Sequence, residues 1–190
     1  PDPRRVLDLL RDAKIPCIQG NHDAFLLDPT LLATYTEAPI VLDAVDWARD
    51  RLRPSDRAFL EGFAAELTVE LAFGVRARLF HGTPRSHMEE LVATTPDDEA
   101  TAMLGDLSYA LYAGGHTHLA MVRSLRGALV VNPGSTGQPF REMNHRGPPV
   151  ILNHAAYAIV GAHDGEPYAE LRRVRPDRKA LVATVTAGDA

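Results

Sequence analysis

The chain has 190 residues, which is room for one domain of ordinary size. Its 20 Lys and Arg against 25 Asp and Glu leave a formal charge of −5, so nucleic acid is a poor candidate partner, because nucleic-acid binding needs a basic surface. An apolar fraction of 45% excludes a disordered chain, and no apolar stretch approaches the roughly 20 residues that span a bilayer, so we expect no membrane partner. The single cysteine, Cys17, excludes an intrachain disulfide, and we expect a cytoplasmic protein without a signal peptide.

Helix signals dominate the first third of the chain. Asp2 is placed to cap a helix whose first residue is Pro3, where a missing N–H costs nothing. Pro54 ends a second helix, and Ser55 is placed to cap a third. A short apolar run predicts a buried strand, and a stretch without periodicity predicts a loop. By residue number, the expected elements are a helix over 3–13, a strand over 15–19, a loop over 24–38, a helix over 41–52 and a helix from 55.

The rest of the chain predicts strands, several of them in antiparallel pairs. Gly74 separates two strand-like runs, and the pair Asp164-Gly165 is a strong hairpin signal. Thr95 and the acidic residues after it predict the start of a helix. The expected elements are strands over 67–73, 75–80, 109–113, 128–131, 155–160 and 168–174, a helix from 95 to 104, and a tail or weak edge strand over 176–190. The sequence therefore predicts a mixed α/β fold.

Polar segments that contain glycine directly follow three of the expected strands. They are residues 20–23 (Gly-Asn-His-Asp), 81–84 (His-Gly-Thr-Pro) and 114–118 (Gly-Gly-His-Thr-His). Because ligands of α/β sheets bind beyond the strand ends, we expect these segments to converge on one site. In an extended loop, His116 and His118 lie on one side and could bind one metal ion or two adjacent ones; the spacing leaves this open.

The donor types in these segments favour a metal site. The candidate ligands are an Asn oxygen and imidazole nitrogens, which suit Zn, Fe, Mn or Ni. No Cys accompanies them, which argues against a structural zinc knuckle. A His-x-His pair by itself is more often part of the solvated surface, and Gly-Asn-His-Asp by itself is typical of a turn. Their joint occurrence, each directly after an expected strand, favours a metal site. The candidate ligands are Asn21, His81, His116 and His118. The other histidines are interpreted as surface or hydrogen-bonded residues: His87, His145, His154 and His163. Among these, His87 is the best candidate for an additional site residue, because it closely follows the segment of His81.

In this order, the three segments resemble the last three motifs of the calcineurin-like metallophosphoesterase superfamily. Residues 132–139 (Asn-Pro-Gly-Ser-Thr-Gly-Gln-Pro) resemble the Asn-Pro-Gly-Ser loop of its small bacterial and archaeal branch, whose members are labelled phosphodiesterases or diadenosine-tetraphosphatase-like. The resemblance covers residues 1–174, which would form the metallophosphoesterase domain, and residues 175–190 would be a C-terminal tail. It implies a four-layer α/β/β/α sandwich of two mixed sheets.

The resemblance also implies a site with two divalent metal ions, Mn, Fe, Zn or Ni. Asn21, His81 and His116 would bind one ion and His118 the other. His22 matches the residue that acts as general acid or stabilises the transition state, and Asp23 a position that supports its loop. Further substrate contacts are implied at Asn132 and Ser135, and Arg141 or Arg146 would replace a phosphate-binding arginine that relatives carry at the position of Phe140.

The chain departs from the family pattern at its start. Relatives begin with Asp-x-His and Gly-Asp-x-x-x-x-Gly motifs, which are absent here, so we expect the first β-α-β stretch and the bridging Asp to be missing. Residues 142–152 form an insertion of unassigned role. Two functions follow: a phosphoesterase in which a metal-bridging hydroxide attacks phosphomonoesters or phosphodiesters, small molecules or nucleotides; or a truncated or degenerate module that binds metal or a partner without turnover. Homo-oligomerisation is left open.

Overall fold

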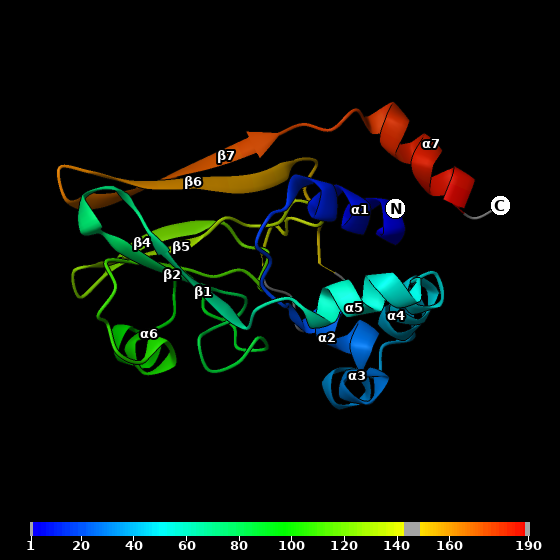
Figure 1. Ribbon diagram of the computed structural model, residues 1–190, viewed down its shortest axis with the longest axis horizontal. Coiled ribbons are helices and arrows are strands. Elements are labelled where there is room, and N and C mark those ends of the chain that lie inside the picture. Colours follow the sequence, from blue (N-terminus) through cyan, green and yellow to red (C-terminus); the bar gives the residue numbers. More distant parts are fainter. Residues whose placement is uncertain (1, 143–148, 189–190) are drawn as a thin grey trace. The chain divides into compact units, whose positions relative to one another are not determined.

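The computed structural model describes residues 2–142 and 149–188 (Figure 1). The chain divides into two compact units, the first made of residues 1–65 and 177–190 and the second of residues 66–176. The first unit is helical, and the second contains both sheets. Among the described residues, no helix is long and apolar enough to cross a membrane.

Most helices of the first unit begin at a proline, which fits the first helical position because its missing N–H has no partner there in any case. The predicted helix over 3–13 is confirmed, and the Asp2 carboxylate accepts a hydrogen bond from the Arg5 N–H at 3.2 Å. The helices are α1 (Pro3–Ala13), α2 (Asn21–Leu27), α3 (Pro29–Tyr35), α4 (Pro39–Asp50), α5 (Pro54–Glu61) and α7 (Arg178–Gly188).

Two predictions for residues 15–38 are wrong. The expected strand over 15–19 forms a single parallel bridge, from Ile18 to Ala64, and Ile15 is half exposed, so the run is not a buried strand. The expected loop over 24–38 contains α2 and α3. Each of these helices has seven residues, too few to display a helical period, and both are held by the burial of Phe25 and Leu32.

The region expected as a tail or weak edge strand also contains a helix, α7. The Asp177 carboxylate accepts hydrogen bonds from the N–H groups of Lys179 and Ala180, which caps the first turn. Leu181 and Val182 are both exposed, so these two apolar side chains of the helix are not part of a buried stripe.

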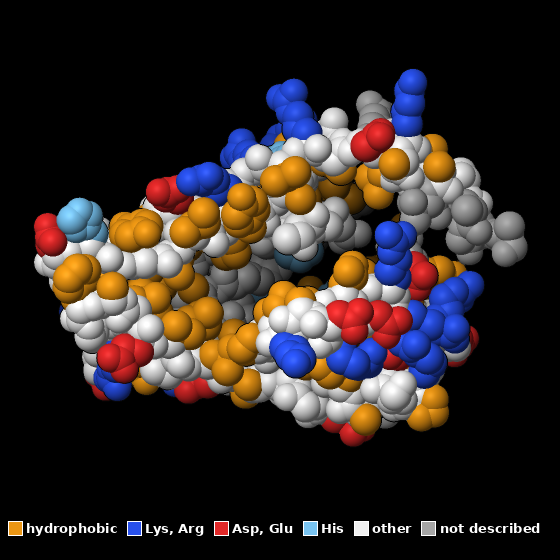
Figure 2. Space-filling view, turned by 45° about the horizontal axis from the view of Figure 1, so that its top comes forward, with side chains coloured by type: hydrophobic (Ala, Val, Ile, Leu, Met, Phe, Trp, Pro, Cys, Tyr) orange, Lys and Arg blue, Asp and Glu red, His pale blue; other side chains and the backbone are white. Residues whose placement is uncertain are grey.

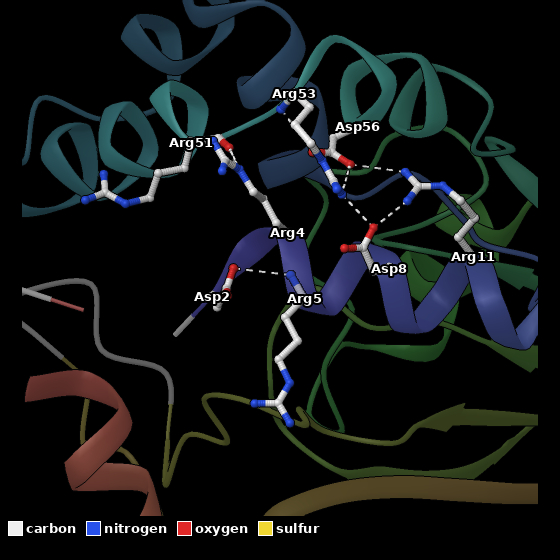
Figure 3. A network of polar contacts seen from close by, with 8 residues as sticks. All are labelled: Asp2, Arg4, Arg5, Asp8, Arg11, Arg51, Arg53 and Asp56. Atoms are coloured by element: carbon white, nitrogen blue, oxygen red, sulfur yellow. Dashed lines mark hydrogen bonds and ion pairs between the residues drawn. The ribbon is translucent and has the colours of Figure 1, made fainter. Parts of the chain in front are cut away.

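A network of ion pairs joins α1 to α5 within the first unit (Figure 3). Asp56 is completely buried and accepts hydrogen bonds from Arg53 Nε at 2.8 Å and Arg11 Nη2 at 3.1 Å. Its carboxylate also caps α5 by accepting the Arg53 N–H, so α5 begins one residue before the expected cap, Ser55. Arg53 in turn binds Asp8 on α1. The hydrogen bonds from Arg53, and then from Arg11, hold the pKa of Asp56 well below its ordinary value.

Asp56→Asn is expected to lower the free energy of unfolding by about 2 kcal/mol, because charge-assisted hydrogen bonds are lost. Since the folded-state pKa of Asp56 is lowered, its contribution is complete above about pH 5 and is lost as the pH falls through that pKa, so the difference between wild type and variant shrinks in acid. Urea denaturation followed by the fluorescence of Trp47, the single tryptophan, measures this. Asp46→Asn, in an exposed pair with Arg49, is the control and should change stability by less than about 0.5 kcal/mol. Equal losses of unfolding free energy in Asp56→Asn and Asp46→Asn would contradict the stabilising role of the buried Asp56 carboxylate.

The second unit is built on a five-stranded sheet in the order β1-β2-β3-β5-β4. The central strands β2, β3 and β5 run parallel, and the edge strands β1 and β4 pair antiparallel with their neighbours. The predicted hairpin around Gly74 is confirmed, and β4 is a strand beyond those expected. The strands are β1 (Glu66–Glu70), β2 (Arg76–Phe80), β3 (Leu111–Ala113), β4 (Met121–Leu125) and β5 (Ala128–Asn132).

The second sheet is the antiparallel pair β6 (Ala155–His163) and β7 (Glu166–Val174). Asp164 and Gly165 both have positive φ, which is the turn that the Asp-Gly pair predicts. Because this tight turn returns the chain directly, the described second sheet is antiparallel and not mixed. The predicted fold class, mixed α/β with two sheets and flanking helices, is confirmed.

Three layers pack against one another in the second unit. Helix α6 (Asp97–Leu104) buries Leu104 against Tyr112 and its neighbours on one face of the five-stranded sheet. On the other face, Leu111 and Val131 pack against small side chains of the β6–β7 hairpin. The outer face of the hairpin carries hydrophobic side chains beside charged ones (Figure 2), among them the exposed Tyr157, Ile159 and Tyr168.

Candidate metal centre

Three parallel strands carry the candidate residues of the second unit at one edge of the sheet. His81 directly follows β2, residues 114–118 follow β3, and Asn132 ends β5. Because the carboxyl ends of parallel strands lie at the same edge, these segments meet. The rings of His81 and His116 lie side by side, with centroids 5.4 Å apart, and the Gly115 N–H donates to the His81 carbonyl.

The loop that carries His116 and His118 is held in a bent conformation. Both histidines have positive φ, 61° and 60°, a region that residues other than glycine seldom adopt and that the surrounding structure must maintain. The Asn132 side chain provides this support: its amide donates to the Gly115 carbonyl at 2.7 Å and to the Thr117 hydroxyl at 3.0 Å. Its oxygen accepts the Gly134 N–H. Asn132, predicted as a substrate contact, is therefore observed as the buried side chain that positions the loop.

His118 is oriented by the chain that follows β5. Its Nδ1 lies 2.8 Å from the Gln138 carbonyl oxygen, and its ring packs against Phe140 with centroids 4.6 Å apart. A carbonyl oxygen only accepts, so Nδ1 carries the proton and the neutral ring has its lone pair on Nε2. This is the arrangement in which an imidazole is prepared to bind a metal ion.

Ser135 and Arg141, the other predicted substrate contacts, lie in the segment after β5. The Ser135 hydroxyl accepts the N–H groups of Gly137 and Gln138, so it shapes the loop. Arg141 is exposed, and its N–H donates to the Val150 carbonyl at the base of the 142–152 insertion. Residues 143–148, which include His145 and Arg146, lie outside the described residues.

The first unit holds Asn21 and His22 in the first turn of α2. Asn21 is buried, and the Asp23 carboxylate accepts the Gly20 N–H at 2.8 Å, the loop-supporting contact expected of Asp23. The His22 side chain keeps an exposed surface, and its ring meets Phe25 edge-on at 5.5 Å between centroids. Partial desolvation by nearby atoms lowers the pKa of His22 below its ordinary value, which favours the neutral ring.

The candidate ligands are thus divided between the two units. Within residues 2–142 and 149–188, no three His, Cys, Asp or Glu side chains form a group that could hold a metal ion. What the second unit does bring together is the imidazole pair of His81 and His116. Neutral imidazoles suit the divalent transition metals, so the donor chemistry of this pair fits such an ion as part of a ligand set.

Gly82 allows the loop after His81 to close on itself. A Cβ atom at Gly82 would lie 2.6 Å from the Ser86 carbonyl oxygen and 2.9 Å from the Glu89 oxygen, both backbone atoms that cannot turn aside. Gly82→Ala is therefore expected to destabilise the protein by about 2 kcal/mol in urea denaturation followed by circular dichroism.

The control for this prediction is Gly115→Ala. A Cβ there would lie 3.6 Å from the His81 carbonyl oxygen, an ordinary contact distance, and stability should be nearly unchanged. Equal stability of the two variants would show that the loop after His81 adapts, and would refute the close-packing argument.

Sequence reasoning missed two side chains near His118. His154, interpreted as a surface or hydrogen-bonded histidine, and Arg173 line a small cavity with His118. Arg173 lies far along the chain from any motif, and only the pairing of β6 with β7 brings it to this cavity, so no local signal could have identified it.

Comparisons with known proteins agree with this fold. A model of the calcineurin-like phosphoesterase superfamily domain matches residues 2–152. The solved structure of the hypothetical protein PH1004 from Pyrococcus horikoshii OT3 is 20% identical, with a TM-score of 0.78, covering 100% of this chain and 75% of that one. A metallophosphoesterase from Sphaerobacter thermophilus is 20% identical, with a TM-score of 0.67, covering 98% and 77%. The comparison with curated proteins found no match.

Proposed function

Because this chain belongs to the calcineurin-like phosphoesterase superfamily, we propose that it is a metal-dependent hydrolase of phosphomonoesters or phosphodiesters. The observation that carries the proposal is the imidazole pair of His81 and His116, which lies at the carboxyl ends of parallel strands in a chain of that family. Small-molecule phosphoesters or nucleotides are the proposed substrates, in keeping with the net charge of −5.

The proposed metal centre uses Asn21, His81, His116 and His118. Asn21, His81 and His116 would hold one divalent ion and His118 a second, with Mn, Fe, Zn and Ni as candidates. Bound ions of this kind acidify water and neutralise charge on a phosphoryl group. The hydrogen bond from His118 Nδ1 to the Gln138 carbonyl supports this role, because a contact of this kind fixes the tautomer and the ring orientation of a metal-binding histidine.

The remaining proposed roles concern the substrate. His22 would donate a proton to the leaving oxygen or a hydrogen bond to an equatorial phosphoryl oxygen, and these two roles stay open. The exposed guanidinium of Arg141 would contact phosphate. Ser135 would act through the loop that its hydroxyl shapes.

A second candidate function is binding of metal or a partner without turnover. One observation favours it: within the described residues, the imidazole pair of His81 and His116 is not completed by a third His, Cys, Asp or Glu into a metal-binding group, as a hydrolytic centre would need. In such a module, His81 and His116 would bind one ion weakly, because neutral ligands leave its charge uncompensated.

One assay separates the two functions. The protein, expressed from its complete reading frame, is given p-nitrophenyl phosphate or bis(p-nitrophenyl) phosphate with Mn²⁺. Release of p-nitrophenol that stops on chelation supports the phosphoesterase. Bound metal without hydrolysis of either ester would refute it and favour the binding module.

A further inference from the structure

A small cavity opens beside His118 in the second unit. Its volume is about 150 Å³, and it is lined by basic and apolar side chains. None of the described side chains that line it is acidic. The residues that matter for its chemistry are His118, Phe140, Arg141, His154 and Arg173.

The pairing of β6 with β7 brings Arg173 to this cavity. Arg173 stands opposite Ala156, which is buried on the inner face of the hairpin, and cross-strand partners share a face. The preceding residue, Arg172, therefore belongs to the outer face, where it forms an ion pair with Glu170. Arg172 and Arg173 thus lie on opposite faces of the hairpin, and Arg172 has an acidic partner in Glu170.

The described lining of the cavity is positively charged through Arg141 and Arg173. Among the described residues, no carboxylate forms an ion pair with Arg141 or Arg173, in contrast to Arg172. Guanidinium groups bind phosphate oxygens through paired N–H donors, and the imidazole of His154 adds a further polar group. The lining therefore suits a small oxyanion.

The size of the cavity further limits which ligands it can hold. A volume of about 150 Å³ equals that of about five water molecules, whereas pockets for whole drug-sized ligands begin near about 300 Å³. A phosphate group fits within this volume. Apolar side chains such as Phe140 and Leu152 form the remaining wall.

We propose that this cavity binds a phosphate group of the substrate other than the one that is hydrolysed, so that the preferred substrate carries two phosphate groups. The inference rests on the proposed function, because it takes His118 to belong to the hydrolytic centre. Arg173 and Arg141 bind the second phosphate, and His118, which lines the cavity, connects it to that centre.

The first test measures binding without turnover. Inorganic phosphate is titrated into the protein in EDTA by calorimetry. Saturable binding is expected, weakened about 10-fold or more in Arg173→Gln and in Arg141→Gln, because each loses a charge-assisted contact. Arg172→Gln, on the outer face, is the matched control and should bind as wild type does. Absence of binding, or equal binding by all variants, would overturn the site.

The second test asks whether the ligand is the substrate's own phosphate. With Mn²⁺, adenosine 3′,5′-bisphosphate is compared with adenosine 5′-monophosphate. Arg173→Gln should raise KM for the bisphosphate about 10-fold and leave KM for the monophosphate unchanged. If Arg173→Gln changed KM equally for both nucleotides, while wild type still bound inorganic phosphate in the first test, the cavity would be a site for free phosphate. That result would overturn the proposal that the cavity binds a phosphate group of the substrate. If no ester is hydrolysed, the proposed function fails, and the calorimetry still decides whether the cavity binds phosphate.

Discussion

His116→Ala is expected to lower the affinity for the divalent ion that His116 would hold and the phosphoesterase turnover together, each by more than about 100-fold. The ring of His116 is one of the two imidazoles that lie side by side, and loss of even an outer-shell contact of a metal ligand costs about 10- to 100-fold. Metal content is measured by mass spectrometry after dialysis against Mn²⁺, and turnover with p-nitrophenyl phosphate. In wild type, EDTA should abolish turnover and Mn²⁺ should restore it.

Two further variants make this prediction specific. His116 has φ of 61°, so His116→Gly removes the imidazole without imposing a side chain on the left-handed backbone, and it should lose metal while keeping its stability. His163→Ala, at the exposed end of β6, should keep both metal and turnover. A His116→Gly protein that retained metal and turnover would show that His116 is not a ligand.

His22→Ala is expected to lower turnover about 100-fold while metal content stays near that of wild type, because His22 is proposed to act on the substrate and not on the ions. Loss of metal in proportion to activity would instead identify His22 as a ligand. His22→Gln, which keeps a polar side chain beside Phe25, separates loss of the imidazole from loss of packing.

Leaving-group dependence separates the two roles left open for His22. If His22 protonates the leaving oxygen, its loss should slow phenyl phosphate much more than p-nitrophenyl phosphate, because p-nitrophenolate is the more stable anion and needs less protonation. If His22 stabilises the equatorial oxygens, both esters should slow by similar factors. Similar factors would therefore contradict the general-acid role.

Sequence reasoning succeeded where the signal is local. The cap of α1 by Asp2 and the turn at Asp164-Gly165 depend on a few neighbouring residues, whose side chains and backbone preferences are the same in any fold. Two of the three polar segments, after β2 and β3, were likewise identifiable, because parallel strands end at one edge, and His81 and His116 do lie together there. The third segment, residues 20–23, follows a single bridge instead of a strand and starts α2 in the first unit. The roles of these residues toward metal and substrate stay predictions.

Other features were decided only by tertiary structure. Residues 24–38 show no period, yet they form α2 and α3, because burial of Phe25 and Leu32 stabilises helices too short to be amphipathic. The strand expected over 15–19 became a single bridge, because Ile18 pairs with Ala64, which itself lies outside the named strands.

The contacts that hold the candidate metal centre in place, and the cavity beside it, were also decided only by tertiary structure. Asn132 was identified from its motif, but its hydrogen bonds to Gly115 and Thr117 exist only because β5 lies beside β3. Arg173 reaches the cavity at His118 through the register of β6 and β7. The sequence by itself determined which side chains carry hydrogen-bond donors or imidazole nitrogens and where the backbone can form a tight turn. Which of these residues lie together was decided by strand order and register, because these contacts join residues far apart in sequence.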